Sequence, residues 1–227
     1  MCILFRLMTL ILFVAAIVLF RALRLKPTVA KTAKIELDHS ELAREYGRRL
    51  AKMIQKETIS VRGNEDRTKF YEFHKELEQL FPKVHTYCEK KEFKGNLLYH
   101  WKGKGNHEPI LLMSHQDVVE ATGEWKKGPF SGEIDEKGRV WGRGAVDTKG
   151  SLLCIFSAVE ELIREGYEPE CDVYIASSCT EEINGEGAPL IAKYLKEMPV
   201  HRARIRRWYV LENLWSMWIR KIHLRQK

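Results

Sequence analysis

Apolar side chains recur every three or four residues in two segments near the start of the chain, a spacing that predicts amphipathic helices. Ser40 is a suitable N-cap for the first helix, which is expected to begin at Glu41. The second helix is expected to begin at about Asp66, and Pro82 is expected to stop it. The apolar stripes of the two helices are formed by Leu42, Tyr46, Leu50, Met53 and Ile54, and by Phe70, Phe73, Leu77 and Leu80.

Shorter apolar runs, bounded by glycine, proline and asparagine, predict strands. An apolar stripe at helical spacing predicts a later helix at residues 151–165, and a final short helix is expected at 188–196. Because strands alternate with helices, the expected fold class is α/β, a mostly parallel sheet with helices on both faces. The expected strands cover residues 84–88, 96–101, 110–114, 139–141 and 172–177.

The N-terminus carries an uncharged apolar run at residues 7–20, preceded by Arg6 and followed by Arg21 and Arg24. Its 14 residues suit the apolar region of a signal peptide and are short for a membrane span. No small-x-small cleavage site follows, and residues 2–20 would just span a bilayer as an uncleaved anchor. We therefore expect entry into the secretory pathway, with the protein either secreted or anchored by this segment.

The formal net charge of +7 is concentrated at one end of the chain. Residues 1–198 hold 30 basic and 30 acidic side chains, whereas residues 199–227 hold 8 basic and 1 acidic. A nucleic-acid-binding face should extend across a folded surface, so no nucleic-acid partner is expected. The five cysteines form no convincing disulfide framework.

Acidic and imidazole side chains follow three of the expected strands. His115 and Asp117 come after the strand at 110–114, Asp147 follows the one at 139–141, and Glu181 and Glu182 follow the one at 172–177. Taken singly, each has an ordinary explanation: a surface histidine, a helix N-cap or a solvated acidic pair. Together, at the edge where an open α/β sheet binds its ligands, they indicate a zinc site.

Four motifs resemble the metallopeptidases of family M20, which include aminoacylase, acetylornithine deacetylase and carboxypeptidase S. They are SHQDVV at 114–119, GPFSG at 128–132 after Trp125, VWGRGAVDTKG at 140–150 and TEE at 180–182. The residues of these motifs are most similar to those of the carboxypeptidase S branch, which includes enzymes that act on N-fatty-acyl amino acids. The resemblance covers about residues 40–197 and implies a zinc-peptidase-like catalytic domain.

The resemblance also implies a role for each residue. His115 would bind one of two zinc ions, Glu182 the other, and Asp147 would bridge both. Glu181 would be the general base that takes a proton from the attacking water, and Asp117 would orient His115. Thr148 stands where many members of the family have a second aspartate.

The resemblance is expected to end before the site is complete. The family uses a further acid about one strand beyond the Glu-Glu pair, a distant histidine and an inserted lid domain, and none of these is assigned here. Glu212 is the only acid after residue 198, and the residues around it do not resemble the end of a strand. The residues around His201 and His223 do not match the family's motif. The expected organisation is a signal peptide or anchor at 1–25, a linker at 26–39, a partial catalytic domain at 40–197 without a lid domain, and a basic, tryptophan-rich tail outside the family at 198–227.

The function expected by lineage is zinc-dependent hydrolysis of the amide bond in N-acyl amino acids or of C-terminal peptide bonds. The partner would then be a small N-acyl amino acid or a short peptide. The alternative is a catalytically inactive, truncated form that lacks the remaining zinc ligands.

Overall fold

The computed structural model describes residues 5–24, 40–105, 107–198 and, for the backbone alone, 2–4 and 208–210. The chain divides into two compact units, residues 1–38 and 39–227, which are considered separately. In the first unit, helix α1 (Cys2–Arg24) contains one stretch, Phe5–Arg24, that is long and apolar enough to cross a membrane. None of that stretch is buried against protein.

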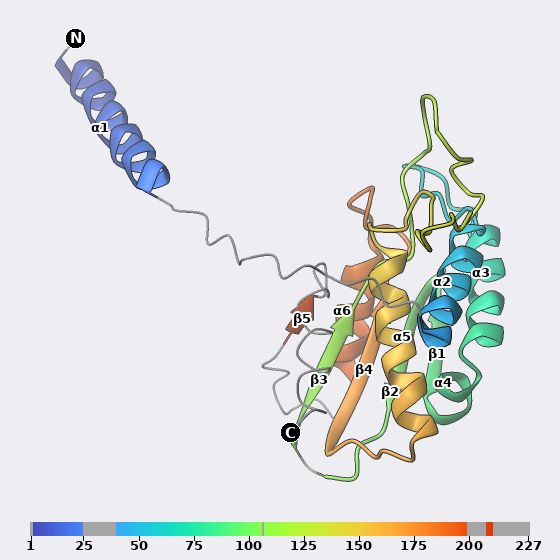
Figure 1. The fold of residues 1–227 in the computed structure, drawn as a ribbon. Helices are drawn as coiled ribbons and strands as arrows, with labels where there is room; N and C mark the ends of the chain where they lie inside the picture. Colours follow the sequence, from blue (N-terminus) through green and yellow to red (C-terminus); the bar gives the residue numbers. More distant parts are fainter. Residues whose placement is uncertain (1, 25–39, 106, 199–207, 211–227) are drawn as a thin grey trace. The chain divides into compact units, whose positions relative to one another are not determined.

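The second unit is built on one five-stranded sheet with the order β1-β2-β4-β3-β5 (Figure 1). Strand β4 (Cys171–Ser177) is parallel to β3 (His107–Met113), which is parallel to β5 (Trp208–Val210). Strand β2 (Asn96–Trp101) is antiparallel to both of its neighbours, β4 and β1 (Glu89–Phe93). Four of the described strands therefore run in one direction, which confirms the mostly parallel sheet.

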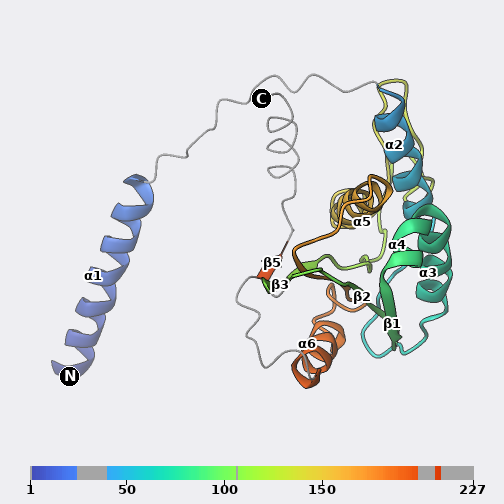
Figure 2. The same cartoon turned by 90° about the horizontal axis from the view of Figure 1, so that it is seen from below.

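Helices cover both faces of the sheet, as expected (Figure 2). One face is covered by α2 (Glu41–Ile54), α3 (Thr68–Leu80), α4 (Pro82–Tyr87) and α5 (Lys149–Arg164), and the other by α6 (Gly187–Glu197). Successive residues of a strand point to opposite faces. In β2, Leu97 and Tyr99 accordingly pack into the larger core beneath α5, whereas Leu98 packs into the smaller core beneath α6.

Local signals place most of the helices correctly. Ser40 caps α2, since its hydroxyl accepts a hydrogen bond of 3.1 Å from the backbone N–H of Ala43. Pro82, however, ends one helix and also opens another, because proline is tolerated in the first turn, where its missing N–H has no partner to lose. The expected strand at 84–88 is therefore wrong: those residues lie largely in α4, and β1 begins at Glu89.

Two further expectations about strands need correction. The segment at 139–141 forms only an isolated bridge, between Val140 and Ile134. Strand β5 lies in the segment expected to fall outside the family, next to β3. Glu212 thus does follow a strand, although Glu212 itself, His201 and His223 lie outside the described residues.

Candidate metal centre

The parallel strands β3 and β4 bring two distant segments together where the strands end. Beyond Met113 and Ser177 the backbones stay paired: Ser114 N–H donates to Ala176 O at 3.1 Å, and Gln116 N–H donates to Ser178 O at 2.9 Å. This pairing holds the segment that carries His115 beside the loop that carries the two glutamates. Asp147 reaches the same place from the turn that precedes α5.

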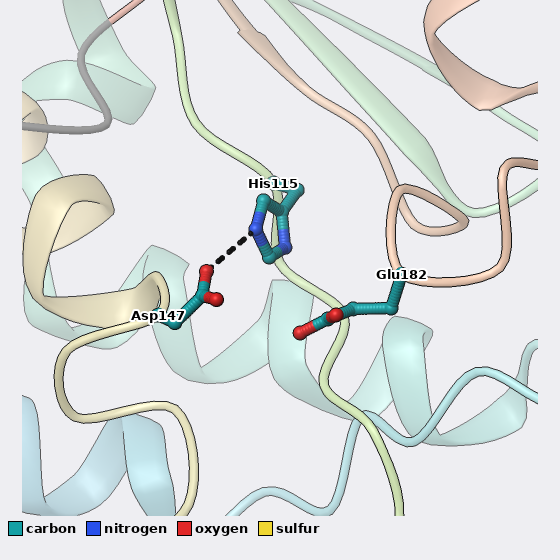
Figure 3. Close-up of side chains that lie close together, drawn as sticks. All are labelled: His115, Asp147 and Glu182. Atoms are coloured by element: carbon teal, nitrogen blue, oxygen red, sulfur yellow. Dashed lines mark hydrogen bonds and ion pairs between the residues drawn. The ribbon is translucent and has the colours of Figure 1, made fainter. Parts of the chain in front are cut away.

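Three of the expected metal ligands converge there. His115, Asp147 and Glu182 each offer one ligand atom, and these atoms all lie within 4.8 Å of one another. Figure 3 shows the three side chains pointing toward a shared space, with the Nε2 atom of His115 3.1 Å from an oxygen of Asp147. One imidazole and two carboxylates form a donor set that suits a zinc ion, and the arrangement therefore fits a metal.

The tautomer of His115 can be read from its contacts. Its Nδ1 atom lies 3.0 Å from the backbone carbonyl oxygen of Asp117, which can only accept a hydrogen bond. Nδ1 therefore carries a proton, and Nε2, which faces Asp147, is the nitrogen available to a metal. This is the arrangement in which a second contact orients a histidine ligand.

Asp117 is fully buried and is surrounded by donors. Its carboxylate accepts hydrogen bonds from the backbone N–H of Glu181 at 3.1 Å, from that of Glu182 at 3.0 Å and from the Ser60 hydroxyl at 2.7 Å. It also lies 3.4 Å from Nδ1 of His115. Asp117 thus connects the histidine to the glutamate loop, a broader role than the orientation of His115 expected from the sequence.

Charges in the site shift the proton affinity of its members. Burial disfavours a charged imidazole, but the hydrogen bond and negative charge of Asp117, together with Glu181, outweigh it and raise the pKa of His115 to about 9. Burial and the nearby charge of Asp147 raise the pKa of Glu182. In the metal-free protein, His115 is consequently an imidazolium at neutral pH and must lose a proton to bind a metal.

Glu181 lies beside the cluster but is not part of the set of three. Its carboxylate is 3.7 Å from Nε2 of His115, and its side chain is 49% exposed. Glu181 is therefore half-exposed and lies next to the three candidate ligands without being one of them.

Two supporting residues were missed by reasoning from the sequence, Ser60 and Lys149. Lys149 is buried beneath the turn of Asp147, and its ammonium donates to the carbonyl oxygens of Met53 at 2.9 Å and Lys56 at 2.6 Å. Burial lowers its pKa to about 7. Both residues make contacts across long stretches of sequence, and no local pattern reveals those contacts.

Comparison with known proteins points to one family of peptidases. The model of Peptidase family M20/M25/M40 matches residues 111–213. The "Probable carboxypeptidase S-like 2" of Dictyostelium discoideum is 39% identical over 159 residues, which are 66% of this chain and 30% of that protein. The "N-fatty-acyl-amino acid synthase/hydrolase PM20D1" of Xenopus tropicalis is 31% identical over 199 residues, 83% of this chain and 39% of that protein.

A solved structure shows the same fold. That of human carnosine dipeptidase 1 aligns with a TM-score of 0.58 at 18% identity, covering 76% of this chain and 39% of that one. The chain matches the model of the peptidase M20 family over residues 111–213 and is similar to these relatives. It spans 30% and 39% of the length of the two relatives, so the activity of a whole family member is a proposal for this chain.

Proposed function

We propose that this chain derives from, and retains the zinc-binding centre of, a hydrolase of amide bonds in N-acyl amino acids or at the C-terminal end of peptides. The observation that carries the proposal is the convergence of His115, Asp147 and Glu182 beside Glu181. The names of the relatives, a carboxypeptidase S-like protein and an N-fatty-acyl-amino acid synthase/hydrolase, support the substrate class.

His115, Asp147 and Glu182 are the residues that would hold the metal, with Asp147 between two ions. Zinc, when bound, supplies Lewis-acid polarisation of the amide carbonyl and a lowered pKa for water. Glu181 takes the proton of the attacking water and passes it to the departing amine. Asp117 keeps His115 and both glutamates in position, through the contacts already described.

Glu212 is our candidate for the further acidic ligand that the family uses. The register of the sheet supports it: Val210 of β5 is paired with Met113 of β3. Along the sequence, Glu212 follows Val210 by two residues, as His115 follows Met113. A Glu212→Gln change is expected to lower the stoichiometry or affinity of zinc binding, measured by titration, while Glu186→Gln serves as a control.

Helix α1 supports a placement in the secretory pathway, as a signal peptide or an anchor. It offers an apolar stretch of 20 residues at the N-terminus, with Arg21 and Arg24 at its end. The division into a segment at 1–25, a linker at 26–39, a partial catalytic domain at 40–197 and a tail at 198–227 remains our proposal. The membrane contact is proposed through α1 alone.

The test of activity uses the full chain, purified in detergent, with zinc and a series of N-acyl amino acids and short peptides. Turnover that disappears in Glu181→Gln, while zinc binding persists, is the expected result for an enzyme. The competing possibility, an inactive form, is favoured by the three ligands found among the described residues. It predicts no turnover and less than one tightly bound zinc ion per chain, a result that would overturn the hydrolase.

A further inference from the structure

The segment that carries His115 and Asp117 is anchored from its opposite side. Side chains alternate along extended backbone, so the side chain of Gln116 points away from those of His115 and Asp117. It is fully buried. Its backbone is also held, because its N–H donates to Ser178 O and its carbonyl accepts from the Thr58 hydroxyl at 2.6 Å.

The orientation of the Gln116 amide is determined by its neighbours. Its Nε2 group donates to the carbonyl oxygens of Gly95 at 2.9 Å and Ser177 at 3.1 Å. The reverse orientation would place the amide oxygen against two carbonyl oxygens, so it is excluded. The Oε1 atom therefore faces His74 of α3, whose Nε2 lies 2.8 Å away and must donate.

The other ring nitrogen of His74 contacts β1. Nδ1 lies 2.8 Å from a carboxylate oxygen of Glu92, which also pairs with Lys90 at 3.2 Å. Burial lowers the pKa of His74, while the hydrogen bonds to Glu92 and Gln116 oppose that effect. Loss of the Nδ1 proton leaves the Nε2–H bond to Gln116 intact, so this bond is available in both protonation states.

We propose that His74 is a positioning residue for the metal centre: its Nε2–H group holds Gln116 and thereby fixes the segment from which His115 and Asp117 project. The reason is mechanical. The three candidate ligands form an exposed rim, since the side chain of Asp147 is 76% exposed, so the rim gives the segment little support. The chain Glu92–His74–Gln116 instead ties the segment to a strand and a helix of the core.

The inference rests on the proposed function only for one measurement, that of zinc affinity. Three substitutions of His74 separate its two hydrogen bonds. His74→Gln keeps a donor near the position of Nε2, His74→Asn keeps one near Nδ1, and His74→Phe keeps the ring shape with neither. We expect zinc affinity to fall about tenfold in the Asn and Phe variants and to stay within about twofold of the parent in the Gln variant.

His85 provides a matched control. Like the buried His74, the half-buried His85 has two ring contacts, to Phe81 O and to the Tyr99 hydroxyl, both at 2.8 Å. Phe81 and Tyr99 lie in the core beneath α5. His85→Phe should lower the melting temperature as His74→Phe does, but leave zinc affinity unchanged. A loss of affinity that simply follows the loss of stability across all four variants would overturn the proposal.

A metal-free measurement keeps the outcome separate from that of the proposed function. NMR of the full chain in detergent micelles, without zinc, follows the backbone amides of Glu181 and Glu182, which bond to Asp117. We expect these signals to shift in His74→Phe and His74→Asn but not in His74→Gln or His85→Phe. Absence of zinc binding by the parent would overturn the proposed function alone. Unchanged Glu181 and Glu182 amide signals in His74→Phe would overturn the positioning role of His74.

Discussion

Asp117 and Asp147 lie on either side of the same imidazole in opposite surroundings. The carboxylate of Asp117 is fully buried, and neighbouring N–H and hydroxyl groups occupy its oxygens. That of Asp147 is 76% exposed, and its described contact is with Nε2 of His115. A buried carboxylate is tolerated because it is fully hydrogen-bonded, whereas a ligand must keep lone pairs free for an ion. The site therefore combines a buried support, Asp117, with an exposed rim of candidate ligands that includes Asp147 and that we propose binds the metal.

The largest effect on metal binding is expected from a substitution of the exposed Asp147. Asp147→Asn replaces a charged ligand by a weak one, and we expect zinc affinity to fall more than about 100-fold, beyond the range typical of supporting residues. The free energy of unfolding of the metal-free protein should change by less than about 0.5 kcal/mol, because the side chain is exposed. Zinc titration and urea denaturation measure the two quantities. A large loss of stability would remove the distinction between the two aspartates.

A substitution of the buried Asp117 should change both zinc affinity and the free energy of unfolding. Asp117→Asn leaves one of the surrounding donors facing an NH₂ group and removes a charge-assisted hydrogen bond. We expect the free energy of unfolding to fall by about 1.5–3 kcal/mol and zinc affinity by about 10–100-fold. The same titration and denaturation experiments apply, with Asp147→Asn as the comparison. Full stability in Asp117→Asn would show that the buried contacts matter less than the geometry implies.

The proton on His115 gives a dependence on pH. Since its pKa is about 9, protons compete with zinc at neutral pH, and affinity should rise about tenfold per unit as the pH approaches 9. The raised pKa also stabilises the metal-free fold. That contribution is fully present below the ordinary value of 6.5 and is lost as pH rises through about 9.

Both effects can be measured on the same samples, by zinc titration and by urea denaturation between pH 6 and 9.5. Asp117→Asn should flatten both profiles, because Asp117 supplies the charge that raises the pKa of His115. If Asp117→Asn had the same pH profiles of zinc affinity and stability as the parent, Asp117 would not be the cause of the pH dependence.

The smallest effect is expected at Ser60, which donates a hydrogen bond to Asp117. Ser60→Ala removes one neutral donor to Asp117 and should cost about 1 kcal/mol of unfolding free energy. Ser157 is a matched control, because its buried hydroxyl has no hydrogen-bond partner among the described residues. Ser157→Ala should be neutral or slightly stabilising in the same denaturation experiment. Equal losses in both variants would mean that the hydroxyl of Ser60 contributes only by its volume.

Reasoning from the sequence was most accurate where the signal was local. Ser40 and the apolar stripe of α2 predicted that helix, and the short apolar run at 172–177 predicted β4. It was wrong at residues 84–88, where a six-residue helix is favoured by Pro82 and by packing against α5. It also missed β5, a strand of three residues whose pairing with β3 comes from a distant part of the chain.

The amino-acid sequence by itself determined the kinds of group in the site and their order, because each of His115, Asp147 and Glu181-Glu182 lies near the end of a strand or the start of a helix that local patterns reveal. Only the tertiary structure decided which carboxylate is buried and which is exposed. Ser60 bonds to Asp117, and His74 bonds to Gln116 beside the site, through hydrogen bonds that join distant segments. Burial and such contacts arise only when the strands pair, so no local pattern of residues encodes them.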